Sequence, residues 1–382
     1  MTWEAWVAIG AFVLAGCAVV LAVLVLRLER ELRSRLEDPD AVGVEVGHGA
    51  DEPGQLVAFV ANPSKPDVAD LKALILGTVA ERGLPQPMWL ETTVDDPGVS
   101  QAREAVRRGA DVVVAVGGDG TVRAVAEGLV GTDVAMGLVP LGTGNLLARN
   151  LDLPVGDAIA ALGIALTGSD RRIDVGWLRV LQPDGENMDE VAHAAAEPSE
   201  ANRSAGEHIF LVIAGVGFDA AMIADTDDGL KARVGWIAYF VSGIRHLHGR
   251  RLRAVVRLDD EPPATLRLRS LLVGNCGRLP GGITLLPDAV LDDGWLDVAA
   301  IDTRGGVAGW AQLLGEVVLQ GVGVKTELPA KIGRIDHARA RRVHVRLANG
   351  EQAQVDGDIV GLAREIEARV EPAGLVVRVA PA

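Results

Sequence analysis

Two glycine-rich segments, each directly after an apolar run, are the part of the sequence best suited to chemistry. The segment Gly117-Gly-Asp-Gly-Thr121 follows the apolar run 112–116. The segment Pro140-Leu-Gly-Thr-Gly-Asn145 follows the apolar run 134–139. Glycines at the end of a strand let backbone N–H groups close on phosphate oxygens, and the start of the next helix adds partial positive charge. The pattern therefore predicts two anion-binding loops.

Asp119 is the charged member of the first loop. A carboxylate there would repel a bare phosphate, so its presence favours a nearby magnesium ion or substrate hydroxyl. The alternative is structural, with Asp119 capping the N-terminus of the following helix. A third loop, Asn62-Pro-Ser-Lys65, closes the apolar run 56–61. We expect the loops to meet at one edge of a parallel sheet, where α/β folds bind ligands.

The segments that would position these loops alternate between apolar runs and helical stretches. The runs lack in-and-out alternation, which is typical of parallel strands covered on both faces. Residues 55–172 are therefore expected to form an α/β nucleotide-binding domain. From 173 to 371 strand-like stretches follow one another, which predicts a second domain that is an antiparallel β-sandwich. Within it, the polar stretch 183–207 is expected to be a mobile insertion, and the piece 372–382 is a candidate to return to the first domain.

The N-terminal segment is predicted to cross a membrane. No charged residue occurs in 6–26, and at about 1.5 Å per residue this run reaches the roughly 30 Å hydrocarbon core of a bilayer. Four arginines lie in 27–35, so the positive-inside rule predicts a single-pass protein of the cell membrane with its catalytic part in the cytoplasm. Residues 1–37 would then be a transmembrane anchor with a juxtamembrane helix, and 38–54 a linker. A cleaved signal peptide is the alternative, disfavoured by Glu4 and by the length of the run.

Composition excludes several classes of protein. The chain has 382 residues, of which 49% are hydrophobic and 23% charged, which is the balance of a globular protein rather than a disordered one. The net charge of −15 and the 3% of aromatic residues are unsuited to binding and stacking nucleic acid. The cysteines, Cys17 and Cys276, allow neither a disulfide framework nor a CxxC zinc site, which favours a reducing compartment.

The order of the motifs along 55–382 resembles that of the diacylglycerol kinase catalytic family, which includes bacterial lipid kinases and sphingosine kinases. The segments that carry the resemblance are Asn62-Pro-Ser, Gly117-Gly-Asp-Gly-Thr121, Pro140-Leu-Gly-Thr-Gly-Asn145, Gly217-Phe-Asp-Ala220, Leu291-Asp-Asp-Gly-Trp-Leu296 and Val355-Asp-Gly-Asp358. The first glycine loop alone is shared with NAD kinases and phosphofructokinase-like enzymes, but the combination is specific. The resemblance implies an N-terminal α/β domain of the phosphofructokinase and NAD kinase type, followed by an antiparallel β-sandwich, residues 173–371, that holds the lipid substrate.

The resemblance also implies ATP and magnesium as cofactors and gives each matching residue a role. The implied ATP site consists of Asn62, Pro63, Ser64, Thr92, Gly117, Gly118, Asp119, Gly120, Thr121, Val122, Arg123, Gly142 and Thr143. Asp119 and Asp358 are implied to be catalytic, Asp358 as the general base. The family has glutamate at that position, and Asp358 is one methylene shorter, although a base must come within about 3 Å of the hydroxyl that it deprotonates.

Two further sites follow from the resemblance. Asp219 is similar to the residue that holds the lipid head group in sphingosine kinases, so it is the candidate for contact with the substrate hydroxyl, with an N-cap as the alternative. A structural magnesium ion would bind the carboxylate of Asp293 and the backbone carbonyls of Val290 and Trp295. For these residues a β-turn is the alternative, because Asp-Asp-Gly is a strong turn signal.

The implied reaction is transfer of the γ-phosphoryl group of ATP to a lipid hydroxyl, first of all that of diacylglycerol. A sphingoid base or another lipid is the alternative. The expected partners are a lipid with a free hydroxyl and the membrane bilayer, while the oligomeric state is left open with a homodimer as one alternative. An NAD kinase is the rival enzyme, disfavoured by the predicted membrane span and by the absence of its Asn-Glu and Gly-Ser-Thr-Ala-Tyr signatures. A lipid or nucleotide sensor without catalysis is the rival of another class.

Overall fold

The computed structural model describes most of the chain from Gly54 to the C-terminus. The described residues are 54–65, 68–83, 85–183, 206–217, 251–279, 283–303 and 333–381, and they belong to one compact unit. Several predictions fall outside them. These are the apolar run 6–26, nearly all of the linker 38–54, most of the insertion 183–207, and Asp219.

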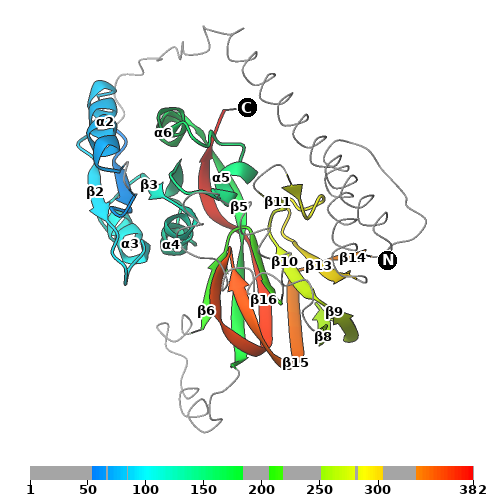
Figure 1. Ribbon diagram of the computed structural model, residues 1–382. Coiled ribbons are helices and arrows are strands. Elements are labelled where there is room, and N and C mark those ends of the chain that lie inside the picture. Colours follow the sequence, from blue (N-terminus) through cyan, green and yellow to red (C-terminus); the bar gives the residue numbers. More distant parts are fainter. Residues whose placement is uncertain are drawn as a thin grey trace, which may run out of the picture. The chain divides into compact units, whose positions relative to one another are not determined.

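Parallel strands form the sheet of the first lobe (Figure 1). They are β1 (Val57–Ala61), β2 (Met88–Glu91), β3 (Val112–Gly117) and β4 (Ala135–Pro140), in the spatial order β4-β3-β1-β2. The helices of this lobe are α2 (Val68–Glu81), α3 (Val99–Arg107), α4 (Asp119–Leu129), α5 (Leu146–Asn150) and α6 (Ala158–Thr167). Every residue of β1, β3 and β4 is buried, because helices cover the sheet on both faces.

Alternate residues of one strand enter different layers of this lobe. Val113 of β3 shares a hydrophobic cluster with Val125 of α4 on one face. Its neighbour Val114 shares a second cluster with Ile75 of α2 and Leu162 of α6 on the other face. Successive side chains of a strand point to opposite faces, so an unbroken Val and Ala run is what a doubly covered strand requires.

Antiparallel strands form the second lobe. They are β5 (Ser169–Pro183), β6 (Glu207–Phe210), β7 (Ile213–Val216), β8 (Leu252–Leu258), β9 (Ala264–Leu268), β10 (Ser270–Gly274), β13 (Leu296–Thr303), β14 (Gly333–Ala340), β15 (Arg342–Val355) and β16 (Asp358–Val379). A separate two-stranded sheet pairs β11 (Arg278–Leu279) with β12 (Ile283–Thr284). The inner side chains of the lobe, among them Phe210, Leu271 and Val345, form a hydrophobic core of their own. This architecture is the expected α/β domain followed by a β-sandwich.

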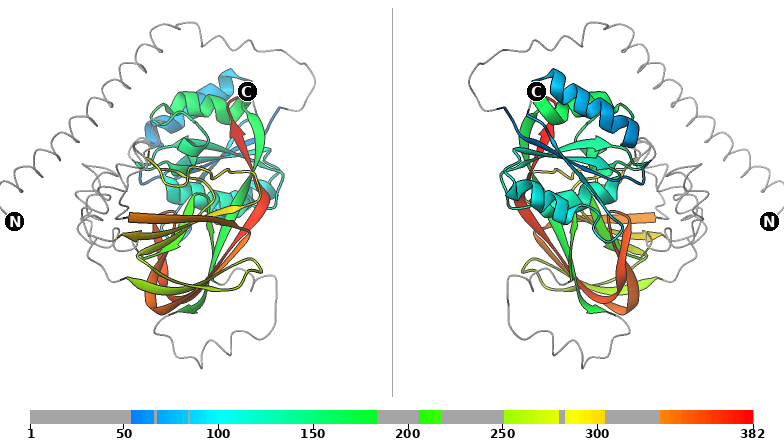
Figure 2. Two further views of the ribbon diagram at one scale, coloured as in Figure 1. Left: turned by 90° about the vertical axis from the view of Figure 1, so that its right-hand side faces the viewer. Right: turned by 90° about the vertical axis from the view of Figure 1, so that its left-hand side faces the viewer.

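The last strand, β16, connects the two lobes. It pairs antiparallel with β15 and with β5 in the second lobe, and its Val377 pairs parallel with Met136 of β4 in the first. Figure 2 shows β16, in red, continuing from one lobe into the other. Among the described residues, 14 strands thereby form a single mixed sheet. The two lobes are consequently fixed to each other by backbone hydrogen bonds as well as by side-chain packing.

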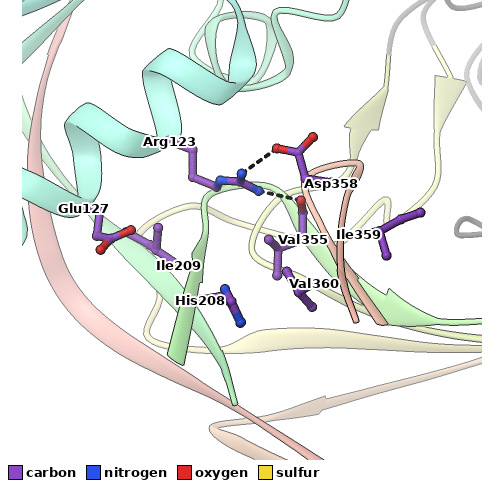
Figure 3. A pocket seen from close by; sticks show the side chains of 8 residues that line it. All are labelled: Arg123, Glu127, His208, Ile209, Val355, Asp358, Ile359 and Val360. Atoms are coloured by element: carbon purple, nitrogen blue, oxygen red, sulfur yellow. Dashed lines mark hydrogen bonds and ion pairs between the residues drawn. The ribbon is translucent and has the colours of Figure 1, made fainter. Parts of the chain in front are cut away.

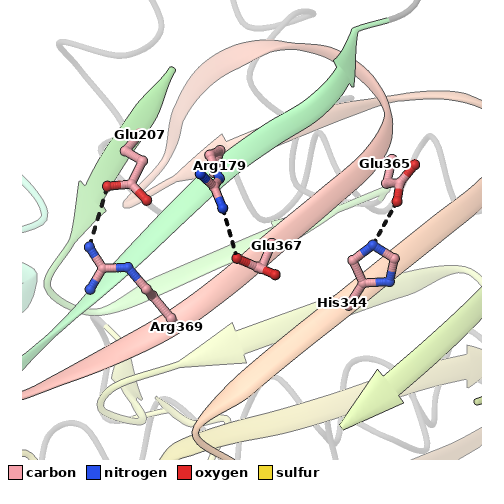
Figure 4. Close-up of polar contacts among 6 residues, drawn as sticks. All are labelled: Arg179, Glu207, His344, Glu365, Glu367 and Arg369. Carbon is pink, nitrogen blue, oxygen red and sulfur yellow. Dashed lines mark hydrogen bonds and ion pairs between the residues drawn. The ribbon is translucent and has the colours of Figure 1, made fainter. Parts of the chain in front are cut away.

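Ion pairs cross the strands around β16. Figure 4 draws the ion pairs Arg179–Glu367 at 3.1 Å and Arg369–Glu207 at 3.3 Å, together with the hydrogen bond between His344 and Glu365 at 2.7 Å. Arg179 and Glu367 are direct partners in the register of β5 and β16. Opposite charges on neighbouring strands contribute about 0.2–1 kcal/mol each relative to alanine pairs, so these contacts favour the observed register of β16.

The predicted location in the cell membrane needs correction. Across the described ranges from 54 to 381, no helix is long and apolar enough to cross a bilayer. On this finding the prediction of a single-pass membrane protein with a cytoplasmic catalytic part is wrong. The apolar run 6–26, on which that prediction rested, lies outside the described residues.

Candidate active site

The predicted loops lie at one edge of the parallel sheet, where neighbouring strands end together. Backbone N–H groups of the loops bond to the last residues of adjacent strands: Asn62 donates to Val116 at 3.0 Å, and Leu141 donates to Gly117 at 2.8 Å. Thr92, buried at the end of β2, donates to the carbonyl of Ala61 at 2.9 Å. The edge therefore carries loops from four neighbouring strands.

Close packing between the two glycine loops explains why they contain glycine. A Cβ atom at Gly142 would lie 2.8 Å from the Cα atom of Gly118, and one at Gly117 would lie 2.7 Å from Oγ1 of Thr121. A Cβ atom at Gly144 would lie 2.6 Å from a carboxylate oxygen of Asp119. Side chains at these positions would push the loops apart, so the glycines hold them in contact.

Asp119 connects the first glycine loop to the second by hydrogen bonds. Its carboxylate accepts hydrogen bonds from the backbone N–H groups of Asn145 at 2.9 Å and Leu146 at 2.6 Å. Asn145 has a left-handed backbone with φ of 48°, and its side chain bonds the N–H and the carbonyl of Gly142. The residue that caps α4 is Gly118. Asp119 therefore caps the start of α5 instead of its own helix.

Burial makes the charged form of the Asp119 carboxyl group less favourable, and hydrogen bonds compensate for part of this effect. Burial raises the pKa of Asp119, the N–H groups of Leu146 and Asn145 lower it, and the negative charge of Asp358 raises it further. The charge of Asp358, on β16, therefore acts on a carboxylate of the first glycine loop.

Lys65 of the third loop reaches the first glycine loop. The amide oxygen of Asn62 accepts hydrogen bonds from the N–H of Ser64 at 3.0 Å and from its hydroxyl at 2.7 Å, which shapes the loop as a tight turn. A Cβ atom at Gly118 would lie 3.9 Å from Cε of Lys65. This lysine was absent from the predicted ATP site, although its place directly after Asn62-Pro-Ser was the available signal. Lysine binds phosphate as a point charge.

Arg123, on the first turns of α4, connects the glycine loops to the predicted base. Its guanidinium donates to the carboxylate of Asp358 at 2.5 Å and to the backbone carbonyl of Val355 at 2.7 Å. The Asp358 side chain remains 61% exposed, against 20% for Arg123. Asp358 is thus oriented by a cation on one side and open to a substrate on the other.

Asp356, in the turn between β15 and β16, is a structural residue that the sequence did not single out. Its carboxylate accepts hydrogen bonds from three successive backbone N–H groups, those of Leu211, Val212 and Ile213, at 2.8, 2.9 and 2.9 Å. Burial raises the pKa of Asp356 to about 6, although these N–H groups and the charge of Arg123 oppose the rise. Asp356 has a φ of 47° and is followed by Gly357 with a φ of 92°. Together they form the tight turn that presents Asp358.

A pocket of about 320 Å³ opens beside Asp358 (Figure 3). Its lining residues come from α4, β6, the end of β15 and the start of β16: Arg123, Glu127, His208, Ile209, Val355, Asp358, Ile359 and Val360. Burial raises the pKa of Glu127, while the charges of Arg103 and Arg123 lower it. Burial also lowers the pKa of His208, and the charge of Arg123 lowers it further. The pocket therefore combines an apolar wall with two titratable groups whose charged forms are disfavoured by burial.

The residues of the predicted ATP site differ in how far they are buried. The side chain of Val122 is buried in the hydrophobic core of the first lobe, and the side chain of Thr121 is 4% exposed beneath Gly117. Pro63, Ser64 and Gly120 are exposed.

The predicted structural magnesium site does not suit a divalent cation in this chain. Asp293 forms an ion pair with Arg339, and its other carboxylate oxygen accepts the N–H of Trp295 at 3.0 Å. Arg339 also approaches Asp297 at 3.9 Å, and Arg341 lies over the ring of Trp295 at 4.8 Å. These two guanidinium groups are positively charged and would repel a metal cation bound beside them. Among the described residues, no group of three or more histidine, cysteine, aspartate or glutamate side chains is placed to hold a metal ion.

An α/β lobe with glycine loops, joined to a β-sandwich lobe that presents a carboxylate beside them, defines a kinase. The model of the diacylglycerol kinase catalytic domain matches residues 60–178. The model of the YegS C-terminal NAD kinase beta sandwich-like domain matches residues 212–379.

Similar proteins agree with these two matches. A protein of Xanthomonas euvesicatoria pv. vesicatoria named "Probable lipid kinase YegS-like" is 30% identical over 284 residues, which cover 72% of this chain and 82% of that protein. A diacylglycerol kinase of Mycobacterium tuberculosis is 30% identical over 279 residues, which cover 72% and 78%. The crystal structure of a diacylglycerol kinase from Bacillus anthracis has the same fold, with a TM-score of 0.62 and 18% identity over 86% of this chain and 98% of that one. The chain belongs to the family of YegS-like lipid kinases and diacylglycerol kinases.

Proposed function

We propose that this protein transfers the γ-phosphoryl group of ATP to the hydroxyl of a neutral lipid, with diacylglycerol as the first candidate acceptor and phosphatidic acid as the product. The observation that carries the proposal is the convergence of the glycine loops, Lys65 and Asp358 at one edge of the sheet. Membership of the lipid kinase family supports the reaction class.

The loops would bind the phosphate groups of ATP. Backbone N–H groups around Gly118 and Gly142, together with the start of α4, offer partial positive charge at the edge where the loops touch. Lys65 adds a full positive charge beside Gly118. The phosphoryl group passes through a transition state with charge spread over its oxygens, so such donors stabilise it electrostatically.

Magnesium would enter this site together with ATP. Magnesium in kinases keeps several waters and needs only one or two carboxylates besides the phosphate oxygens, and Asp119 meets that requirement. The carboxylate oxygens of Asp119 accept backbone hydrogen bonds from Asn145 and Leu146, and two oxygens offer about four lone-pair sites, which leaves room for an ion or its water. Bound there, the ion supplies neutralisation of phosphate charge.

Asp358 would act as the general base. The lipid hydroxyl oxygen forms a bond to the γ-phosphorus, the bond from that phosphorus to the bridging oxygen of ADP breaks, and the hydroxyl proton passes to the Asp358 carboxylate. Arg123 keeps that carboxylate oriented at 2.5 Å, and its exposed side leaves room for the acceptor. Orientation by Arg123 would offset the missing methylene relative to the family glutamate.

A sphingoid base or another lipid alcohol remains the alternative acceptor, while contact with a bilayer and a homodimer remain predictions. The test is labelling of a total lipid extract in detergent micelles with radiolabelled γ-phosphate of ATP and magnesium, followed by chromatography. We expect one labelled phospholipid product with wild type and with Glu104→Gln, whose side chain on α3 is 42% exposed, and its loss with Asp119→Asn. No label with wild type, or an undiminished rate with Asp119→Asn, would contradict the proposal.

A further inference from the structure

We propose that Asn150, the last residue of α5, is a positioning residue that fixes the glycine loops relative to the proposed base by bonding the backbone of the second lobe. Asn150 lies outside both the predicted ATP site and the pocket beside Asp358. This inference rests on the proposed function and deepens it, because it names a residue away from the reacting atoms on which the geometry of the site depends.

The side-chain amide of Asn150 joins α5 to β11 (Figure 1). Its nitrogen donates to the backbone carbonyl of Arg278 at 2.9 Å, and its oxygen accepts the N–H of Arg278 at 3.0 Å. The same nitrogen donates to the carbonyl of Leu146 at 2.9 Å. Asn150 is buried, so water competes little for these bonds. An amide carries the donor and the acceptor that this double contact with one residue requires.

Leu146 connects Asn150 to the first glycine loop. Its carbonyl accepts the Asn150 amide, and its N–H donates to the carboxylate of Asp119 at 2.6 Å. The short helix α5 is therefore held at both ends, by Asp119 where it begins and by β11 where it ends. A shift of α5 relative to the second lobe would displace the Asp119 carboxylate together with the second glycine loop.

The backbone just before Arg278 leads to the turn between β15 and β16. The N–H groups of Asn275 and Cys276 donate to the carbonyl of Val212 at 2.9 and 3.3 Å. The N–H of Val212 in turn donates to the carboxylate of Asp356 at 2.9 Å. The segment 275–278 is thus bonded to the chain that Asp356 holds, and Asp356 forms the turn that presents the proposed base.

Together with Arg123, these contacts form a closed ring around the site. One route leaves Asp119 along α4 and reaches Asp358 through Arg123. The other passes through Asn150, the backbone of the second lobe and Asp356. Two separate routes restrict the relative motion of the two carboxylates more than one does, and a misplacement of about 1 Å can cost about 10²-fold in rate.

Asn150 is not required to hold the lobes together. Strand β16 already connects them by backbone hydrogen bonds, and one hydrophobic cluster contains Leu147 of the first lobe and Leu286 of the second. Loss of the Asn150 amide would therefore leave the fold intact, while α5 would become free to shift relative to β11. The expected consequence is a slower reaction rather than unfolding.

The test replaces Asn150 by aspartate and by alanine. Asn150→Asp keeps the volume and the acceptor for the N–H of Arg278, but an ionised carboxylate has no donor for the two carbonyls. Asn150→Ala removes all three bonds. Asp152→Asn is the matched control, because it breaks the exposed ion pair of Asp152 with Arg278 at the same contact and leaves both backbone bonds of Arg278 in place. Asparagine also tolerates the φ of 56° at position 152.

Kinetics and binding are measured with ATP, magnesium and dioctanoylglycerol, a short-chain diacylglycerol, at a temperature below the Tm of every variant. We expect kcat to fall about tenfold in both Asn150 variants. The Kd for ATP and the KM for dioctanoylglycerol are expected to stay as in wild type, because the groups that would bind the two substrates are all still present. Asp152→Asn should match wild type in every constant.

Amide hydrogen exchange tests the connection without any reaction. We expect the N–H groups of residues 211–213, which bond Asp356, to exchange faster in both Asn150 variants, because a broken contact lowers the free energy of local opening. Exchange in α2, which lies outside the ring, should stay unchanged. Asp152→Asn should again behave like wild type.

The other outcomes contradict the inference in distinguishable ways. Asn150 variants with a lower Tm, but with the kcat and the exchange at 211–213 of wild type, would make Asn150 a purely structural residue. A raised Kd for ATP with an unchanged kcat would assign Asn150 to ATP binding instead. Wild type that labels no lipid would overturn the proposed function, and exchange at 211–213 that is the same in wild type and both Asn150 variants would overturn the connection itself.

Discussion

Arg123 and Asp358 are 235 positions apart in the sequence and form an ion pair of 2.5 Å. Arg123 lies on the helix that begins at the first glycine loop, and Asp358 begins the strand that connects the two lobes. The same guanidinium bonds the carbonyl of Val355 at 2.7 Å, so it holds the backbone of the turn as well as the carboxylate. This contact positions the proposed base relative to the proposed phosphate site.

Arg123→Lys tests that positioning. Lysine keeps the charge but lacks the planar fork that bonds Asp358 and Val355 together. Loss of one charge-assisted hydrogen bond, worth about 1.5–3 kcal/mol, predicts a fall of about tenfold or more in kcat. Steady-state kinetics with dioctanoylglycerol measure it, and Arg107→Lys, at an exposed pair on α3, is the control. An unchanged kcat would mean that the fork does not orient the base.

Lys65→Ala tests the contribution of the third loop to ATP binding. The stem of Lys65 lies beside Gly118, where its ammonium would meet a phosphate oxygen. We expect the KM for ATP to rise about tenfold while the KM for the lipid stays the same. Lys72→Ala removes a lysine that pairs with Glu91 on the outer part of the lobe and should leave both constants unchanged. Equal effects of the two variants would contradict a specific role for Lys65.

The raised pKa of Asp356 predicts that the free energy of unfolding depends on pH. Burial raises its pKa in the folded state from the ordinary value of 3.8 to about 6, so the folded state binds this proton more tightly than the unfolded state does. The stabilisation that results is fully present below pH 3.8 and is lost as pH rises through about 6. Denaturant titrations at several pH values, for wild type and Asp356→Asn, measure it. The variant is expected to be less stable throughout, because an amide nitrogen cannot accept the N–H of Leu211, and to lack this slope. A slope that persists in the variant would assign the effect to other groups.

The ion pair of Arg339 with Asp293 predicts that the stability of wild type is independent of magnesium. The guanidinium already neutralises Asp293 and approaches Asp297, whose pKa burial raises. In Arg339→Ala these carboxylates lose their cation, and a magnesium ion could replace it. We expect a lower Tm in the variant, partly restored by millimolar magnesium, with a recovery of about 2–4 °C for each 1 kcal/mol. Wild type and Arg107→Ala should show no response. A magnesium-dependent Tm in wild type would restore the original metal prediction.

Local patterns were sufficient to predict the first lobe and its loops. The alternation of strands and helices over 55–172 follows from the apolar runs, and the loops at 117–121 and 140–145 follow from glycines placed where strands end. These are short-range relationships between neighbours in the chain. Parallel strands covered on both faces leave an unbroken apolar run, which few other structures produce.

Contacts between residues far apart in the sequence could not be predicted from such local patterns. The hydrogen bonds of Asp119 to Asn145 and Leu146 depend on how closely the two glycine loops pack, which no pattern within either loop indicates. Strand β14 has a polar sequence without an apolar pattern, and its place at an edge of the sheet depends on pairing with β13. The ion pair of Asp293 with Arg339 likewise joins residues whose proximity is created by that pairing.

The most direct test of the account is phosphoryl transfer to dioctanoylglycerol by wild type and by Asp358→Asn, with ATP binding measured in both. The account predicts labelled phosphatidic acid from wild type, a rate lower by about 10²-fold or more in the variant, since general-base catalysis contributes about 10²–10⁴-fold, and equal ATP binding. Full activity in the variant would contradict the role of Asp358. Wild type that binds ATP without labelling any lipid would contradict the kinase itself and favour a sensor.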